Sequence, residues 1–135
     1  MGLPEKRALE AFKTAEFTAL QTSINAITGG KVEWDIHWDT LMQDGMVEYF
    51  KDAATKIYFT PLLAALQAVC IDDMGKKAVA GALKKIVIKS DSGSYHGGNY
   101  TFENGVLDLT HDSNSNIDAV DERKTYIQTL LESKL

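Results

Sequence analysis

One segment, Lys31 to Trp38, constrains the fold more than any other part of the chain. Apolar and polar side chains alternate strictly in it, with the apolar ones at Val32, Trp34, Ile36 and Trp38. This period of two is typical of a β-strand with one buried and one solvated face. A strand inside a doubly wound parallel sheet would be apolar on both faces, so the alternation favours an antiparallel or one-sided sheet. The segment therefore predicts an α+β fold rather than an α/β fold.

Helical patterns fill the chain on both sides of this strand. Residues 4–28 are good helix formers, and their apolar positions recur at helical spacing until Gly29-Gly30 ends the pattern. Residues 39–85 also show only helical patterns, with a new helix predicted to start at Thr60-Pro61 because threonine caps helices and proline suits the first helical position. A last helix is predicted to reach Leu135. The apolar stretch 62–71 predicts a helix that is either central to the core or half committed to a partner, and the core position is favoured.

The remaining part of the chain is rich in strand signals. Residues 85–89 carry a β-branched run, and Asn104-Gly105 is the strongest short hairpin signal, because both central residues of a type I′ turn need positive φ. We therefore expect an antiparallel sheet of about four strands, with N-terminal and C-terminal helices on one face and a central helical insert after the first strand. Residues 1–135 are predicted to form a single α+β domain.

Charge and hydropathy exclude several classes of partner. The net charge is −5, from 19 acidic and 14 basic residues, and no basic run exceeds two residues, so we expect no nucleic-acid partner. The longest apolar stretch, residues 59–71, is shorter than the about 20 residues that span a bilayer, so we expect no membrane partner. Charged residues at Glu5 and Lys6 stand in place of an apolar N-terminal segment, which predicts a cytoplasmic protein without a signal peptide. Cys70 is the only cysteine, so we expect no intramolecular disulfide.

The polar face of the first strand holds the candidate site residues Glu33, Asp35 and His37. The alternation places these three side chains on one side of the strand. Two carboxylates and an imidazole are suited to bind a divalent metal or to act as acid and base. The alternative is a solvated strand face that is charged because it contacts water.

Two loops resemble ligand-binding motifs without matching them. Residues 112–118 begin like a calcium loop, but Ile117 replaces the glycine of its sixth position and Arg123 the glutamate of its twelfth, so we expect a capped helix start there. The glycine-rich residues 91–98 fit neither phosphate-binding motif, and we expect a flexible turn.

The sequence leaves three hypotheses for function. The first is a non-enzymatic protein–protein interaction or regulatory module that has a protein partner or forms a homo-oligomer, without cofactors and without catalytic residues. The second is a small metal-dependent enzyme or ligand-binding protein that uses Glu33, Asp35 and His37. The third is a pocket between sheet and helices that binds an apolar ligand.

Overall fold

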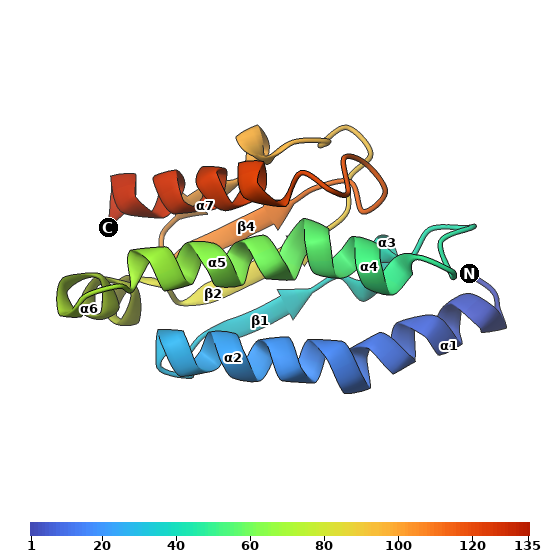
Figure 1. The fold of residues 1–135 in the computed structure, drawn as a ribbon, viewed down its shortest axis with the longest axis horizontal. Helices are drawn as coiled ribbons and strands as arrows, with labels where there is room; N and C mark the ends of the chain where they lie inside the picture. Colours follow the sequence, from blue (N-terminus) through green and yellow to red (C-terminus); the bar gives the residue numbers. More distant parts are fainter.

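Helices cover one face of a four-stranded sheet in the computed structural model, which describes residues 1–135 (Figure 1). The sheet lies behind three parallel runs of helix: α1 with α2, α4 with α5, and α7. The helices are α1 (Leu3–Phe12), α2 (Thr18–Thr28), α3 (Trp38–Leu41), α4 (Phe50–Ala54), α5 (Thr60–Val69), α6 (Asp73–Ala82) and α7 (Val120–Lys134). The strands are β1 (Glu33–Ile36), β2 (Lys85–Lys89), β3 (Thr101–Glu103) and β4 (Val106–Thr110).

The α+β class is confirmed, but the predicted antiparallel sheet is wrong because the sheet is mixed. Its strand order is β1-β2-β4-β3, in which β1 pairs with β2 and β2 with β4 in parallel, and only β3 and β4 pair in antiparallel. The helical insert between β1 and β2 carries the chain back to the end of the sheet where β1 began, so β2 runs in the same direction. The alternation along β1 indicates that one face of the strand is covered, but it does not indicate whether the neighbouring strand runs parallel or antiparallel to it.

The β3–β4 hairpin has the predicted turn. Asn104 and Gly105 both have positive φ, 53° and 79°, as a type I′ turn requires. A Cβ atom on Gly105 would also lie 2.8 Å from the carbonyl oxygen of Ala82, so this glycine is needed for both its backbone conformation and its close approach to the end of α6.

Two of the helical runs are interrupted by a π turn. Lys13–Phe17 (η1) joins α1 to α2, and Thr55–Phe59 (η2) joins α4 to α5, with helical backbone angles maintained through both. The α-helical segment α5 does start at Thr60 with Pro61 in its first turn, as predicted, but it continues η2 without a break, and Thr60 does not cap it. Pro61 lacks an N–H and crowds the preceding turn, and the wider π turn directly before it accommodates this change in the hydrogen-bond ladder.

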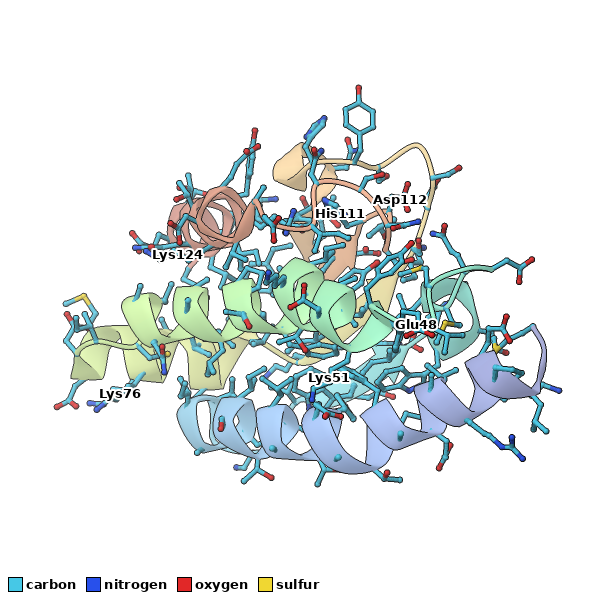
Figure 2. The ribbon with its side chains drawn as sticks, turned by 45° about the vertical axis from the view of Figure 1, so that its right-hand side comes forward. Glu48, Lys51, Lys76, His111, Asp112 and Lys124 are labelled. Carbon is cyan, nitrogen blue, oxygen red and sulfur yellow. The ribbon has the colours of Figure 1, made fainter.

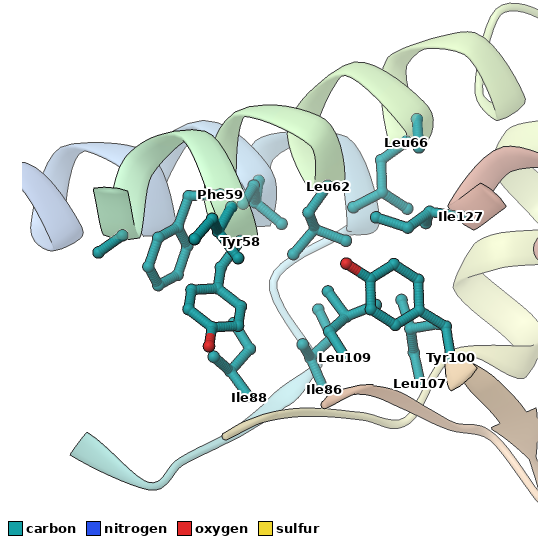
Figure 3. Close-up of a cluster of buried hydrophobic side chains, with 14 of the residues drawn as sticks. Tyr58, Phe59, Leu62, Leu66, Ile86, Ile88, Tyr100, Leu107, Leu109 and Ile127 are labelled. Carbon is teal, nitrogen blue, oxygen red and sulfur yellow. The ribbon is translucent and has the colours of Figure 1, made fainter. Parts of the chain in front are cut away.

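The apolar side chains form one core of 28 buried residues between the helices and the sheet. Figure 3 shows Leu62 and Leu66 of α5 facing Ile86 of β2 and Leu107 of β4. The central position predicted for the apolar helix is confirmed for α5, whose buried residues include Leu62, Ala65, Leu66 and Val69. No helix is long and apolar enough to cross a membrane.

Candidate functional site

The predicted site residues, Glu33 and Asp35 of β1 and His37 directly after it, lie on the sheet face that the helices leave open. The Trp34 indole packs inward against Phe17, with ring centroids 5.8 Å apart, so the neighbouring residues of the strand point outward. Asp35 and His37 come together, with Oδ1 and Nε2 3.4 Å apart, and the Lys85 ammonium lies 3.6 Å from the other carboxylate oxygen of Asp35. Glu33 is exposed and stands next to Lys85 in the parallel register.

A shallow hollow of about 520 Å³ adjoins this pair at the carboxyl end of β1. Asp35, His37, Trp38 and Asp39 contribute to its lining, and the Lys13 ammonium lies 5.4 Å from the centre of the Trp38 ring. Nowhere in the structure is a group of three or more His, Cys, Asp or Glu side chains placed to hold a metal ion. Asp35 can orient the imidazole of His37, so the chemistry available here is that of a single general base.

The calcium-like loop is organised around Asp112 at the carboxyl end of β4. Its carboxylate accepts hydrogen bonds from the Gln43 amide at 3.0 Å, the Asn114 N–H at 3.0 Å and the Ser115 hydroxyl at 2.8 Å. Burial opposes ionisation of Asp112, but these hydrogen bonds outweigh it and hold its pKa below the ordinary value. The predicted capped helix start is wrong, since α7 follows Ala119 without any side-chain cap.

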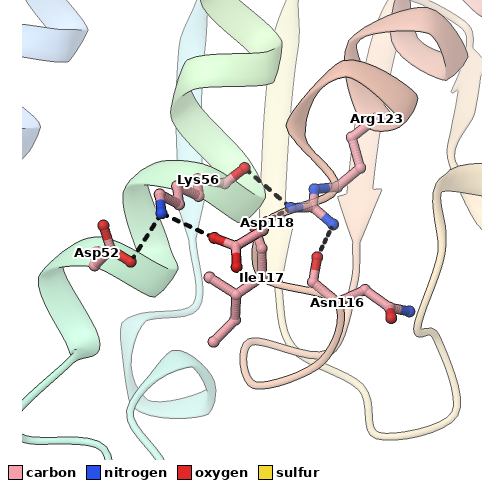
Figure 4. Close-up of polar contacts among 6 residues, drawn as sticks. All are labelled: Asp52, Lys56, Asn116, Ile117, Asp118 and Arg123. Atoms are coloured by element: carbon pink, nitrogen blue, oxygen red, sulfur yellow. Dashed lines mark hydrogen bonds and ion pairs between the residues drawn. The ribbon is translucent and has the colours of Figure 1, made fainter.

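Arg123 is fully buried and ties this loop to the second helical run (Figure 4). Its guanidinium donates to the carbonyl oxygens of Asn116 at 2.7 Å, Ile117 at 2.6 Å and Lys56 at 3.2 Å. The Lys56 carbonyl belongs to the π turn η2, where the altered pattern of backbone hydrogen bonds leaves carbonyl groups without a donor from the helix. The Lys56 ammonium meets Asp118 at 2.8 Å in addition. Arg123 therefore joins the loop to the helix, a structural role that the comparison of residues 112–123 with a calcium loop did not predict.

His111 lies beside this arginine in a buried polar cluster with Tyr58 and Tyr100. The Tyr58 hydroxyl donates to the His111 carbonyl oxygen, and the imidazole lies 6.5 Å from the Tyr58 ring and 6.3 Å from the Tyr100 ring. Burial lowers the pKa of His111 and raises the pKa of both tyrosines, so all three side chains are neutral near pH 7. The Tyr100 hydroxyl, His111 Nε2 and Arg123 Nε have no hydrogen-bond partner. Because the cluster is sealed from solvent, a substrate has no access to it.

An apolar patch at the α5–α6 turn lies at the far end of the molecule from His111, near Lys76 in Figure 2. Ile71 is 81% exposed and Met74 is 82% exposed. Both line a hollow of about 410 Å³, which Val69, Ala78, Leu135, Asp72, Gly75 and Glu132 complete. We call Val69, Ile71, Met74, Ala78 and Leu135 the α5–α6 patch.

A close contact between α5 and α6 holds this patch at the surface. Asp72 caps α6 by accepting from the Gly75 N–H at 2.8 Å, and a Cβ atom on Gly75 would lie only 1.8 Å from the Val69 carbonyl oxygen. The first turn of α6 therefore presses against the end of α5, and Ile71 and Met74 face outward on the connection between them. Sequence reasoning assigned Ile71 to the core helix, because its apolar run gives no sign of where α5 ends.

The chain matches no protein-family model, no curated protein and no solved structure.

Proposed function

We propose that this chain is a non-enzymatic protein-interaction module that binds its partner through the α5–α6 patch. The observation that carries the proposal is the pair Ile71 and Met74, two large apolar side chains that are adjacent to one hollow and each more than four-fifths exposed. Isolated exposed apolar residues are common, but contiguous ones around a hollow are typical of interaction sites. Burying one such side chain contributes about 1.5–3 kcal/mol, so the pair can anchor a partner.

The charges that line the hollow favour a basic partner. Asp72 and Glu132 line the hollow, and no lysine or arginine does. The chain also has a net charge of −5. Basic residues that flank the inserted apolar side chain of a partner would lie close to these two carboxylates and would favour binding. We therefore propose a partner segment with apolar anchors and neighbouring lysine or arginine.

A second copy of the chain fits this surface poorly. In a two-fold dimer formed through this patch, both copies would bring Asp72 and Glu132 into the interface, and neither hollow is lined by a basic residue that could pair with them. Like charges brought together in an interface are costly. The patch is therefore better suited to a different, basic protein.

A peptide-display selection tests this proposal. The full chain serves as bait, and the Ile71→Ser/Met74→Ser variant serves for counter-selection. The matched control is Tyr49→Ser, which changes an exposed apolar residue outside the patch. We expect selected peptides to combine apolar residues with lysine or arginine, and to bind the double variant at least about 30-fold more weakly, from roughly 2 kcal/mol lost. Peptides that bind the double variant as well as the wild type would contradict the proposal.

The β1 face supports a second candidate function, a small-molecule site that uses His37 as a base. The observation that favours it is the contact between Asp35 and His37 beside the hollow at the end of β1. A Glu33→Ala/Asp35→Ala/His37→Ala variant tests it, because all three side chains lie on the open face and the fold should persist. A ligand or divalent metal that raises the melting temperature of the wild type and not of this variant would favour the second function over the first.

A further inference from the structure

The glycine-rich loop between β2 and β3 is built by specific hydrogen bonds. The Gly93 N–H donates to the Asp91 carboxylate at 2.9 Å, and the Ser94 carbonyl oxygen accepts from the Asp112 N–H at 2.6 Å. The Asn116 amide donates to the Tyr95 carbonyl oxygen at 2.6 Å. The loop, which lies beside the start of α7 in Figure 1, is thus attached to the segment that follows β4.

This attachment displays a row of aromatic side chains at the surface. Tyr95 is 56% exposed and Tyr126 of α7 is 40% exposed. His96 lies between them, with its ring 5.3 Å from the Tyr95 ring and 6.4 Å from the Tyr126 ring. We call these three residues the aromatic corner, because the Tyr95 and His96 rings stand at 79° to each other.

Two consecutive glycines make room for the corner. A Cβ atom on Gly97 would lie 2.7 Å from Cδ2 of Tyr126, and one on Gly98 would lie 2.6 Å from Cε1 of His96. Neither glycine has a positive φ. Their small size, and not their backbone freedom, is therefore what allows both rings to lie against the loop.

Tyr126 of the corner also lines a hollow on α7 whose polar groups are hydroxyls and one carboxylate. Glu122, Thr125, Tyr126 and Thr129 line a surface hollow of about 490 Å³, and no lysine or arginine is among them. His96 Nδ1 accepts from the Gly98 N–H at 2.9 Å, so in the neutral ring the proton is on Nε2, which is a donor. The surface thus offers both donors and acceptors beside exposed aromatic rings.

We infer that the aromatic corner and its hollow bind a neutral carbohydrate. Sugar rings present C–H groups that contact aromatic rings, and hydroxyls that both donate and accept hydrogen bonds. The absence of a basic side chain from the hollow disfavours phosphorylated or acidic ligands. A proline-rich peptide offers mainly carbonyl acceptors and leaves the Glu122 carboxylate without a donor, whereas a sugar hydroxyl supplies one.

Saturation-transfer and ¹H–¹⁵N NMR titrations test this site. The full chain is titrated with methyl β-glucoside, methyl α-mannoside, methyl β-galactoside, cellobiose and chitobiose, and separately with a polyproline peptide. Tyr95→Ala is the test variant because its side chain is exposed, and Tyr49→Ala is the control because Tyr49 is an exposed tyrosine elsewhere. We expect at least one sugar to bind in about the millimolar range and to shift amide signals of residues 95–98 and 125–129.

The expected result is at least about tenfold weaker sugar binding in Tyr95→Ala and unchanged binding in Tyr49→Ala. Failure of every sugar to bind would overturn the inference, as would shifts confined to other residues or equal loss in both variants. Binding of the polyproline peptide instead of the sugars at residues 95–98 would also overturn it. These outcomes are independent of the α5–α6 patch, which no substitution here alters.

Discussion

The two buried tyrosines Tyr58 and Tyr100 should respond in opposite ways to the same substitution. The Tyr58 hydroxyl donates to the carbonyl oxygen of His111. The Tyr100 hydroxyl has no partner, and in Figure 3 it points into the cluster of apolar side chains. Replacement by phenylalanine removes one oxygen in each case and leaves the ring, so the pair isolates the energetics of the hydroxyl.

The change in the free energy of unfolding depends on whether the substitution leaves a buried polar group without a hydrogen-bond partner. Tyr58→Phe leaves the His111 carbonyl oxygen buried without its donor, which should lower the free energy of unfolding by about 1–3 kcal/mol. Tyr100→Phe removes a buried hydroxyl that is dehydrated and unpaired, so the free energy of unfolding should stay the same or rise by about 1 kcal/mol. The free energies of unfolding of the two variants should therefore differ by about 1–4 kcal/mol.

Urea unfolding followed by circular dichroism gives both values, provided that the m-values agree with that of the wild type. Equal destabilisation of the two variants would refute the reasoning, because the two hydroxyls would then be equally well bonded. A loss above about 1 kcal/mol in Tyr100→Phe alone would show that its hydroxyl has a hydrogen-bond partner, such as a buried water.

Three further outcomes follow from the structure. Gly75→Ala should lower the free energy of unfolding by about 1–3 kcal/mol, because the added Cβ atom would collide with the end of α5. Gly81→Ala in the same helix should raise the free energy of unfolding by about 0.5–1 kcal/mol, because its Cβ atom would meet nothing within 4 Å. Equal effects of the two substitutions in thermal unfolding would contradict the close contact between α5 and α6. Gly105→Val should cost more than about 1 kcal/mol in the same assay, because valine at positive φ is strained, and an unchanged melting temperature would contradict the hairpin. The free energy of unfolding should fall as the pH drops below 6.5, the ordinary pKa of histidine, because burial lowers the pKa of His111 in the folded state and the unfolded chain therefore binds the proton first. If a His111→Asn variant loses stability with falling pH as steeply as the wild type does, the pH dependence belongs to other groups.

Several elements were predictable because their signals are local. The type I′ turn at Asn104-Gly105 and the end of α2 at Gly29, whose φ is 92°, depend on backbone preferences of one or two residues. The outward position of Asp35 follows from the period of two along β1. The contact between Asp35 and His37 was likewise foreseeable, since both belong to one face of one short segment.

Other features could not be predicted because they join distant parts of the chain. Lys56 and Arg123 are 67 positions apart, and Tyr58 and His111 are 53 apart, so no local pattern brings either pair together. The same holds for Gly97, whose reason for being glycine is the Tyr126 ring of α7. Each of these contacts forms only when the part of the chain after β4, which includes α7, packs against the rest of the fold.

The sequence by itself determined approximately where the main helices, strands and the hairpin turn lie, and which face of each is apolar, because these depend on the period of neighbouring side chains. Only the tertiary structure decided that β1, β2 and β4 run parallel, since strand direction depends on how the helical insert crosses the sheet. It also decided which apolar residues stay exposed. Ile71 and Leu66 belong to one apolar stretch, yet Leu66 is fully buried beside Ile127 of α7 (Figure 3) and Ile71 is exposed to solvent. The reason is that α5 ends at Val69, so Ile71 lies in the turn before α6.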